Sequence, residues 1–272
     1  MPIPERMNPT FVSARPTEPD RMEEARKHLI VALDVPGTEA AEDMVRQLEG
    51  ACQWFKVGLE LFAAAGPAVV ETLAARGLSV FLDLKFHDIP NTVAGAVRSA
   101  AGLGARMMTV HAAGGPAMLA AARAALDGVA DPPQLLAVTV LTSIDAAQLK
   151  ATGVTRSPAE QVELLARMGW EAGIRGFVCS PQEVMAVRAL TGAEAVLAVP
   201  GIRPAGAEAP SPSPTHSHSR SHSNDQKRIA TPASALGAGA SYLVVGRPIT
   251  QAHDPAKAAE VILQEMAHAI AF

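Results

Sequence analysis

The sequence predicts an α/β fold of the (β/α)₈, or TIM-barrel, type, in which eight parallel strands close into a ring and helices follow the strands. Three observations lead to this prediction. Eight short apolar runs recur along the chain, segments of helical composition separate them, and no G-x-G-x-x-G pattern follows the first run, where an open dinucleotide-binding sheet would carry one. The length of 272 residues also suits a barrel, which typically needs about 250.

The predicted strands are nearly continuous apolar runs, as expected for parallel strands that are buried on both faces. They are His28–Val35, Trp54–Gly58, Ser79–Phe86, Met107–Ala112, Leu135–Thr142, Gly176–Ser180, Val196–Ile202 and Tyr242–Arg247. The segments between them are rich in Ala, Leu, Glu and Arg and predict helices, among them Thr38–Glu49, Leu59–Arg76 and Pro158–Ala172. Ser157-Pro158 and Ser180-Pro181 are helix-start patterns.

Composition excludes several classes of partner. Hydrophobic residues make up 49% of the chain and charged residues 18%, which is enough apolar surface for a large core. The net charge of −4, without a dense basic stripe, argues against nucleic acid, and no apolar stretch approaches the roughly 20 residues that cross a bilayer. Cys52 and Cys179 lie in or beside apolar runs without a paired framework, which predicts a reducing, cytoplasmic location.

Two segments fall outside the barrel pattern. Residues 1–27 are polar and lack the apolar core of a secretory signal, so we expect a flexible extension before a barrel domain at 28–272. The Pro/Ser/His tract at 210–224 predicts a disordered insertion between strands seven and eight. Its histidines His216, His218 and His222 suggest a metal site as an alternative, but a flexible tract without supporting partners binds metal weakly, so we expect none.

The third predicted strand carries the main catalytic candidates. Alternation along a strand places Phe81, Asp83 and Lys85 on one face, and the apolar residues between them suit contact with helices. Asp83 and Lys85 then point into the barrel at its carboxyl end, where the active sites of this fold lie. Asp88 begins the loop that follows.

Two further charged residues occur at neighbouring strand ends. Asp34 closes the first strand and Lys56 lies within the second. Charges among apolar strands are unfavourable unless they pair, so we expect these two to join Asp83 and Lys85. Inward charges at the catalytic end favour function, and a structural ion-pair network at the barrel mouth is the alternative.

The ends of strands seven and eight predict a phosphate site. Pro200-Gly201-Ile202-Arg203 ends one strand and Gly246-Arg247 the other, and barrel enzymes often bind phosphate at these two loops. Two histidines near strand ends are weaker acid–base candidates. We expect a structural or loop role for His87 and a packing or hydrogen-bonding role for His111.

Together these motifs resemble the orotidine 5′-monophosphate decarboxylase family. The signature D-x-K-x-x-D-I-P-x-T appears at residues 83–92, and LIVALD, FKVGLELF, VLTS, VPGIRP, DQKRIATP and YLVVGRPIT resemble the family's other landmarks in the same order. The resemblance extends from about Leu29 to Ile262. It implies a homodimeric carboxy-lyase that needs no metal or organic cofactor and converts orotidine 5′-monophosphate to UMP, the last step of de novo pyrimidine biosynthesis.

The resemblance also implies a role for each matching residue. Lys85 would donate the proton, flanked by Asp83 and by Asp88 reaching across from the second subunit. The implied substrate-binding residues are Asp34 and Lys56 at the ribose, Thr142 near the pyrimidine, and Ile89 and Thr92 of the signature. Arg203, Gln226, Gly246 and Arg247 would bind the phosphate. The chain departs from the family pattern in the long segment that precedes Gln226.

Two other functions remain open at this point. A sugar-phosphate lyase or epimerase on the same barrel, including metal-dependent relatives that share D-x-K-x-x-D, would use the same phosphate site. It would not account for the D-I-P-x-T extension together with the DQKR segment. A non-catalytic nucleotide-binding barrel, with the histidine tract as a metal or partner tether, would leave Lys85 and its flanking aspartates without a use.

Overall fold

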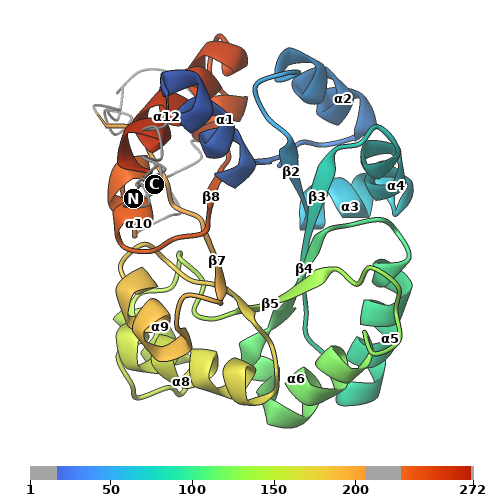
Figure 1. Ribbon diagram of the computed structural model, residues 1–272. Helices are drawn as coiled ribbons and strands as arrows, with labels where there is room; N and C mark the ends of the chain where they lie inside the picture. The colour runs from blue at the N-terminus through green and yellow to red at the C-terminus, as the bar shows by residue number, and fades with distance from the viewer. Residues whose placement is uncertain (1–16, 206–227, 271–272) are drawn as a thin grey trace, which may run out of the picture.

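The computed structural model of the chain describes residues 17–205 and 228–270. Its eight strands are all parallel and form a closed barrel in chain order, with β8 pairing back to β1. Figure 1 looks along the barrel and shows the helices arranged around the ring of strands. The predicted fold is therefore confirmed.

The strands agree with the apolar runs in number, order and position. They are β1 (Leu29–Ala32), β2 (Trp54–Gly58), β3 (Ser79–Phe86), β4 (Met107–His111), β5 (Gln134–Val138), β6 (Gly176–Val178), β7 (Val196–Val199) and β8 (Tyr242–Val245). Six of the predicted runs extend past the observed strand at the carboxyl end, because their last residues leave the ladder and enter the loops above the barrel.

The helices surround the strands. They are α1 (Glu18–His28), α2 (Thr38–Gln47), α3 (Leu59–Ala65), α4 (Ala68–Ala75), α5 (Pro90–Ala101), the 3₁₀ helix η1 (Ala112–Gly114), α6 (Gly115–Ala124), α7 (Ala146–Ala151), α8 (Pro158–Glu171), α9 (Val184–Thr191), α10 (Pro232–Gly237), α11 (Arg247–Thr250) and α12 (Pro255–Ala269). The predicted helix 59–76 is interrupted by Gly66, whose φ of 67° lies in the left-handed region, and by Pro67. The Ser180-Pro181 pattern does not begin a helix at Pro181, since α9 begins at Val184.

Two apolar layers hold the barrel together. One lies between the strands and the helices. The other fills the inside of the ring and consists of Ile30, Ala32, Phe81, Met107, Leu136, Ala198 and Val244. Phe81 belongs to the inner layer and Leu82 to the outer one, which is the alternation predicted for β3. The inner layer therefore forms a packed floor beneath the strand ends.

The amino-terminal segment differs from the expected flexible extension over residues 18–27. These residues form α1, which a capping box between Thr17 and Asp20 begins. The helix packs against α12, as Figure 1 shows, and it buries Ala25 completely while Met22 contacts the core. The sequence did not predict this helix because the segment is polar except for these two apolar contacts. Residues 1–16 lie outside the described part of the chain, as does the predicted insertion 210–224 with His216, His218 and His222.

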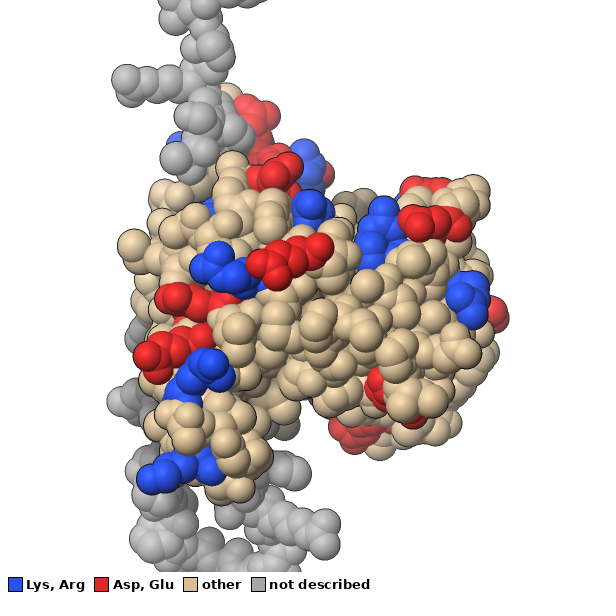
Figure 2. Space-filling model, turned by 90° about the horizontal axis from the view of Figure 1, so that it is seen from below, with Lys and Arg blue, Asp and Glu red and all other residues tan. Residues whose placement is uncertain are grey.

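The surface carries charges of both signs. On the face shown in Figure 2, the lysines and arginines of the described residues lie among aspartates and glutamates. None of the described helices is long and apolar enough to span a membrane.

Replacing Leu136 by alanine tests the inner layer. Leu136 is fully buried inside the ring, so Leu136→Ala should lower the free energy of unfolding by about 2–5 kcal/mol through lost contacts and a residual cavity. Denaturant unfolding measures this change. The control is Met185→Ala, since Met185 is 70% exposed and should change stability by no more than about 0.5 kcal/mol. Equal effects of the two substitutions would contradict a packed barrel interior.

Candidate active site

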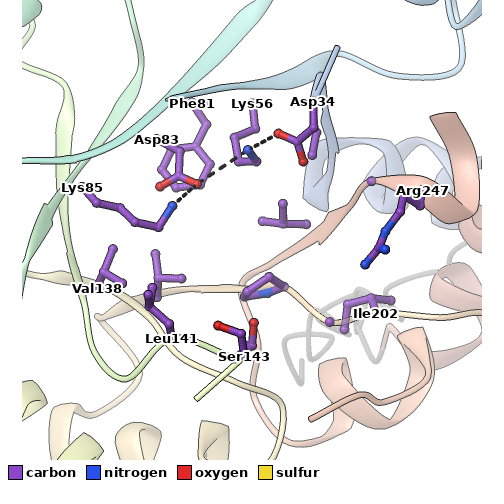
Figure 3. Close-up of a pocket in the computed structure, with 18 of the residues that line it drawn as sticks. Asp34, Lys56, Phe81, Asp83, Lys85, Val138, Leu141, Ser143, Ile202 and Arg247 are labelled. Carbon is purple, nitrogen blue, oxygen red and sulfur yellow. Dashed lines mark hydrogen bonds and ion pairs between the residues drawn. The ribbon is translucent and has the colours of Figure 1, made fainter. Parts of the chain in front are cut away.

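A cavity of about 400 Å³ opens at the carboxyl ends of the strands, above the inner apolar layer. Its walls come from the ends of β1, β2, β3, β5, β6 and β8 and from loops at this end of the barrel, including the loop after β7. Figure 3 shows charged side chains along one wall, with Leu141 and Ser143 across the cavity from them. Concave sites of this size at the end of a barrel are where small molecules bind.

The charged wall is a continuous chain of ion pairs. The Lys85 ammonium donates a hydrogen bond to Asp83 at 2.8 Å, and the Lys56 ammonium lies 3.6 Å from the same carboxylate. Lys56 also donates to Asp34 at 2.9 Å. Carboxylates and ammonium groups therefore alternate along the wall in the order Asp34, Lys56, Asp83, Lys85, as the dashed lines in Figure 3 mark.

The two central members of this chain are buried yet charged. Burial by itself would lower the pKa of Lys56, but the carboxylates of Asp83 and Asp34 outweigh it and raise that pKa above its usual value. Burial would likewise raise the pKa of Asp83, but Lys56, Lys85 and hydrogen bonds outweigh it and hold that pKa below its usual value. Each group keeps its charge because its neighbours carry the opposite one.

Gly58 makes room for the pair formed by Lys56 and Asp34. A Cβ at this position would lie 2.8 Å from the Lys56 Nζ atom and 3.1 Å from the Asp34 Oδ1 atom. Any larger residue would therefore push the ammonium away from its carboxylate. The end of β2 carries both the charged residue and the glycine that accommodates it.

The end of β3 has an irregular backbone that Thr109 of β4 supports. Lys85 has a φ of 50°, in the left-handed region that residues other than glycine rarely adopt, and the register with β4 shifts between Leu82 and Phe86. The backbone N–H of Lys85 donates to the Thr109 hydroxyl at 2.8 Å, and this hydroxyl donates to Asp83 at 3.1 Å. One fully buried hydroxyl thus connects the two catalytic candidates.

The rest of the cavity is lined by loops. Leu141, Thr142 and Ser143 follow β5. The β7 end supplies Gly201, with a φ of 83°, and Arg203, while Gly246 and Arg247 follow β8. In Figure 3 Arg247 reaches toward the cavity from the side away from Lys85. Two arginines near one end of the cavity suit an anion, and the described residues hold no group of three or more His, Cys, Asp or Glu that could bind a metal ion.

Comparison with known proteins agrees with this geometry. The family model described as "Orotidine 5'-phosphate decarboxylase / HUMPS family" matches residues 27–262. The chain belongs to this family.

Individual relatives of the family are similar over nearly the whole chain. A protein of Anaeromyxobacter dehalogenans named orotidine 5'-phosphate decarboxylase is 51% identical, with 87% of this chain and 96% of the relative covered. A protein of the same name from Nitrosococcus oceani is 49% identical, with 91% and 100% covered. The crystal structure of orotidine 5'-phosphate decarboxylase from Lactobacillus acidophilus superposes with a TM-score of 0.73 at 38% identity, covering 88% of this chain and 98% of that one.

Most of the residues that resemble the family's site lie together in the cavity. The lining includes Asp34, Lys56, Asp83, Lys85, Thr142, Arg203, Gly246 and Arg247. Asp88, Ile89 and Thr92 do not line the cavity of their own chain. They are exposed on the loop after β3 and the start of α5, where the Asp88 carboxylate accepts the Ile89 N–H at 2.6 Å. Gln226 lies outside the described residues.

Two contributors to the site were not predicted from the sequence. Thr109 is one of two polar or titratable residues in the mostly apolar run Met107–Ala112, the other being His111. No spacing rule connects Thr109 to Asp83 and Lys85, more than twenty residues earlier. Gly58 stands two residues after Lys56, and this spacing could have suggested a glycine that accommodates a charged side chain.

The two histidines near the site stack on each other outside the cavity lining. Their ring centroids are 5.4 Å apart, and the His111 Nδ1 atom accepts the Ala113 N–H at 3.2 Å. Burial, together with electrostatic repulsion from His87 and Lys85, lowers the pKa of His111 to about 4. His111 has the hydrogen-bonding role expected for it, as a neutral ring.

The titration of His111 can be followed by NMR, and its midpoint should lie near pH 4. The unfolded chain binds this proton near pH 6.5 and the folded chain only near 4, so His111 lowers stability as pH falls through that interval. His87→Ala should raise the midpoint only in part, because burial is the larger cause. A midpoint near 6.5 in the folded protein would contradict this environment.

Proposed function

We propose that the chain catalyses the cofactor-independent decarboxylation of orotidine 5′-monophosphate to UMP, the last step of de novo pyrimidine biosynthesis. The observation that carries the proposal is the position of Lys85 and Asp83 at one end of a cavity whose other end has Arg203 and Arg247. Relatives about half identical over nearly their full length bear this enzyme's name.

Lys85 is the proposed proton donor. Breaking the bond between C6 and the carboxylate releases CO₂ and leaves the electron pair on C6, in an orbital that the pyrimidine π system does not stabilise. An ammonium beside C6 stabilises this charge and then transfers its proton to the carbon, and solvent restores the proton on Lys85. The 2.8 Å hydrogen bond to Asp83 holds the Lys85 ammonium at the lining of the cavity.

The other residues position the substrate in this proposal. Asp34 and Lys56 bind the ribose hydroxyls, and Thr142 lies at the pyrimidine. Arg203, Gln226, Gly246 and Arg247 bind the phosphate, while Ile89 and Thr92 contact substrate from the loop beside Asp88. Contacts to a phosphate far from C6 lower the barrier by holding the reacting ring in place.

The proposed enzyme is a homodimer in which Asp88 completes the partner's site. Its exposed position outside the cavity of its own chain supports a contact with a second subunit. We also propose a cytoplasmic location, since both cysteines are buried free thiols whose pKa burial raises to about 12, which suits a reducing compartment.

Turnover of orotidine 5′-monophosphate by the purified chain in EDTA tests the proposed reaction. The absorbance of the orotate ring should decrease in the chelator at the same rate as without it. Lys85→Ala should reduce the rate by at least about a thousand-fold, because it removes both the charge beside C6 and the proton. Circular dichroism checks its fold. Activity that requires Mg²⁺ would instead favour the sugar-phosphate lyase or epimerase reading, and near-normal turnover by Lys85→Ala would refute the role of Lys85.

Mixing two inactive variants tests the shared site. A dimer of one Lys85→Ala subunit and one Asp88→Ala subunit keeps one site in which both residues are intact. Random pairing of equal amounts should restore about a quarter of the wild-type activity, since half of the dimers are hybrids with one site of two. Size-exclusion chromatography and mass spectrometry establish that hybrids form. Hybrids that form and stay inactive would exclude a shared Asp88.

A further inference from the structure

A buried charged cluster lies behind the cavity wall. It consists of Ser180 after β6, Glu183 before α9 and Arg228 before α10, which we call the rear cluster. Glu183 is 5% exposed, Arg228 is 7% exposed and Ser180 is fully buried, and none of the three lines the cavity. They therefore have no place among the residues proposed to contact the substrate.

The contacts of the rear cluster connect three separate loops. One Arg228 nitrogen, Nη1, donates to the Glu183 carboxylate, and the other carboxylate oxygen accepts the Ser180 hydroxyl. The second Arg228 nitrogen, Nη2, donates to the carbonyl of Leu141 at 2.9 Å and to that of Val140 at 3.3 Å. One side chain thus bonds to both the loop after β5 and the segment before α9.

The loops that Arg228 connects carry opposite ends of the cavity. Val140 and Leu141 line the cavity and lead directly into Thr142, which also lines it. Figure 3 shows Leu141 across the cavity from the charged wall. On the other side, Ala230 lies two residues after Arg228, accepts the Arg203 N–H at 2.9 Å and donates to the Gly201 carbonyl at 3.1 Å. Arg228 therefore stands between the proposed pyrimidine side and the proposed phosphate side.

The buried ion pair between Arg228 and Glu183 is not expected to contribute much to the stability of the fold by itself. Removing both charges from water costs about as much as their attraction returns, and well-packed apolar residues often stabilise a core more. A planar guanidinium with two separate nitrogens does what an apolar residue cannot, because it fixes two backbone carbonyls and a carboxylate in one geometry.

We propose that Arg228, held in place by Glu183, is a positioning residue that sets the loop after β5 against the segment carrying Arg203, and so fixes the distance between the pyrimidine and phosphate contacts. The proposal rests on the proposed function. It names Arg228 and Glu183 as residues that affect substrate affinity without touching the substrate.

Arg188 provides a matched control. It is another arginine that donates to backbone carbonyls, at Gly192, Ala195 and Gly239. These lie before β7 and β8, at the end of the barrel opposite the cavity. Lysine at either position keeps the charge but has a single nitrogen, so each substitution loses some of the carbonyl contacts.

The experiment compares Arg228→Lys, Arg188→Lys and the unaltered full-length chain. Each is assayed with orotidine 5′-monophosphate and titrated with UMP by calorimetry, and the calorimetric stoichiometry gives the fraction of competent sites. Arg228→Lys should raise both KM and the UMP dissociation constant about ten-fold or more, the factor expected for losing a charge-assisted hydrogen bond. Arg188→Lys should lower the melting temperature and leave both constants within two-fold, roughly the scatter of such substitutions.

Two outcomes would overturn the proposal. In one, Arg228→Lys changes only the competent fraction or the melting temperature, with KM and UMP affinity as in the unaltered chain, which is the result of a merely structural role. In the other, Arg188→Lys raises KM as much as Arg228→Lys does. If Arg228→Lys does not fold, Glu183→Gln is measured in its place and should raise KM in the same direction. If the unaltered chain does not turn over orotidine 5′-monophosphate, the proposed function itself is rejected. If the unaltered chain is active and Arg228→Lys has the same KM and UMP affinity, only the positioning role of Arg228 is rejected.

Discussion

The structure of the site depends on the pairing of charges that lie within an apolar barrel. Lys56 and Asp83 are each only 8% exposed, and neither would remain charged at this depth alone. The pKa of Lys56 is raised because it lies beside Asp83 and Asp34, and the pKa of Asp83 is lowered because it lies beside Lys56 and Lys85. The alternation of opposite charges therefore keeps the Lys56 ammonium protonated although it is buried above the inner apolar layer.

This pairing also explains the local backbone. Lys85 adopts a left-handed conformation that costs free energy for a residue with a Cβ, and the register of β3 against β4 shifts around it. The Thr109 hydroxyl compensates by bonding to the Lys85 N–H and to the Asp83 carboxylate. From this irregular backbone the Lys85 ammonium donates to the Asp83 carboxylate at 2.8 Å.

Much of the fold could be predicted because each strand is a compact apolar run, and alternation within β3 places Asp83 and Lys85 together. Contacts between segments that are distant in the sequence could not be predicted in this way. Glu183 stands at the N-cap of α9, and nothing local in the sequence indicates that it pairs with Arg228, 45 residues later. The helix α1 was missed because a single buried alanine and one methionine anchor it amid a polar sequence. Patterns over neighbouring residues predict helices and strands, whereas the contacts between distant side chains depend on how those elements pack in three dimensions.

A double-mutant cycle on Lys56 and Asp83 tests the interdependence of the buried charges most directly. The free energy of unfolding would be measured for the unaltered chain, Lys56→Met, Asp83→Asn and the double variant. Since the two groups lie 3.6 Å apart and each supports the charge of the other, the double variant should lose less stability than the sum of the single ones, by about 1–3 kcal/mol. Additivity within about 0.5 kcal/mol would contradict the account, because it would mean that the two charges are held independently.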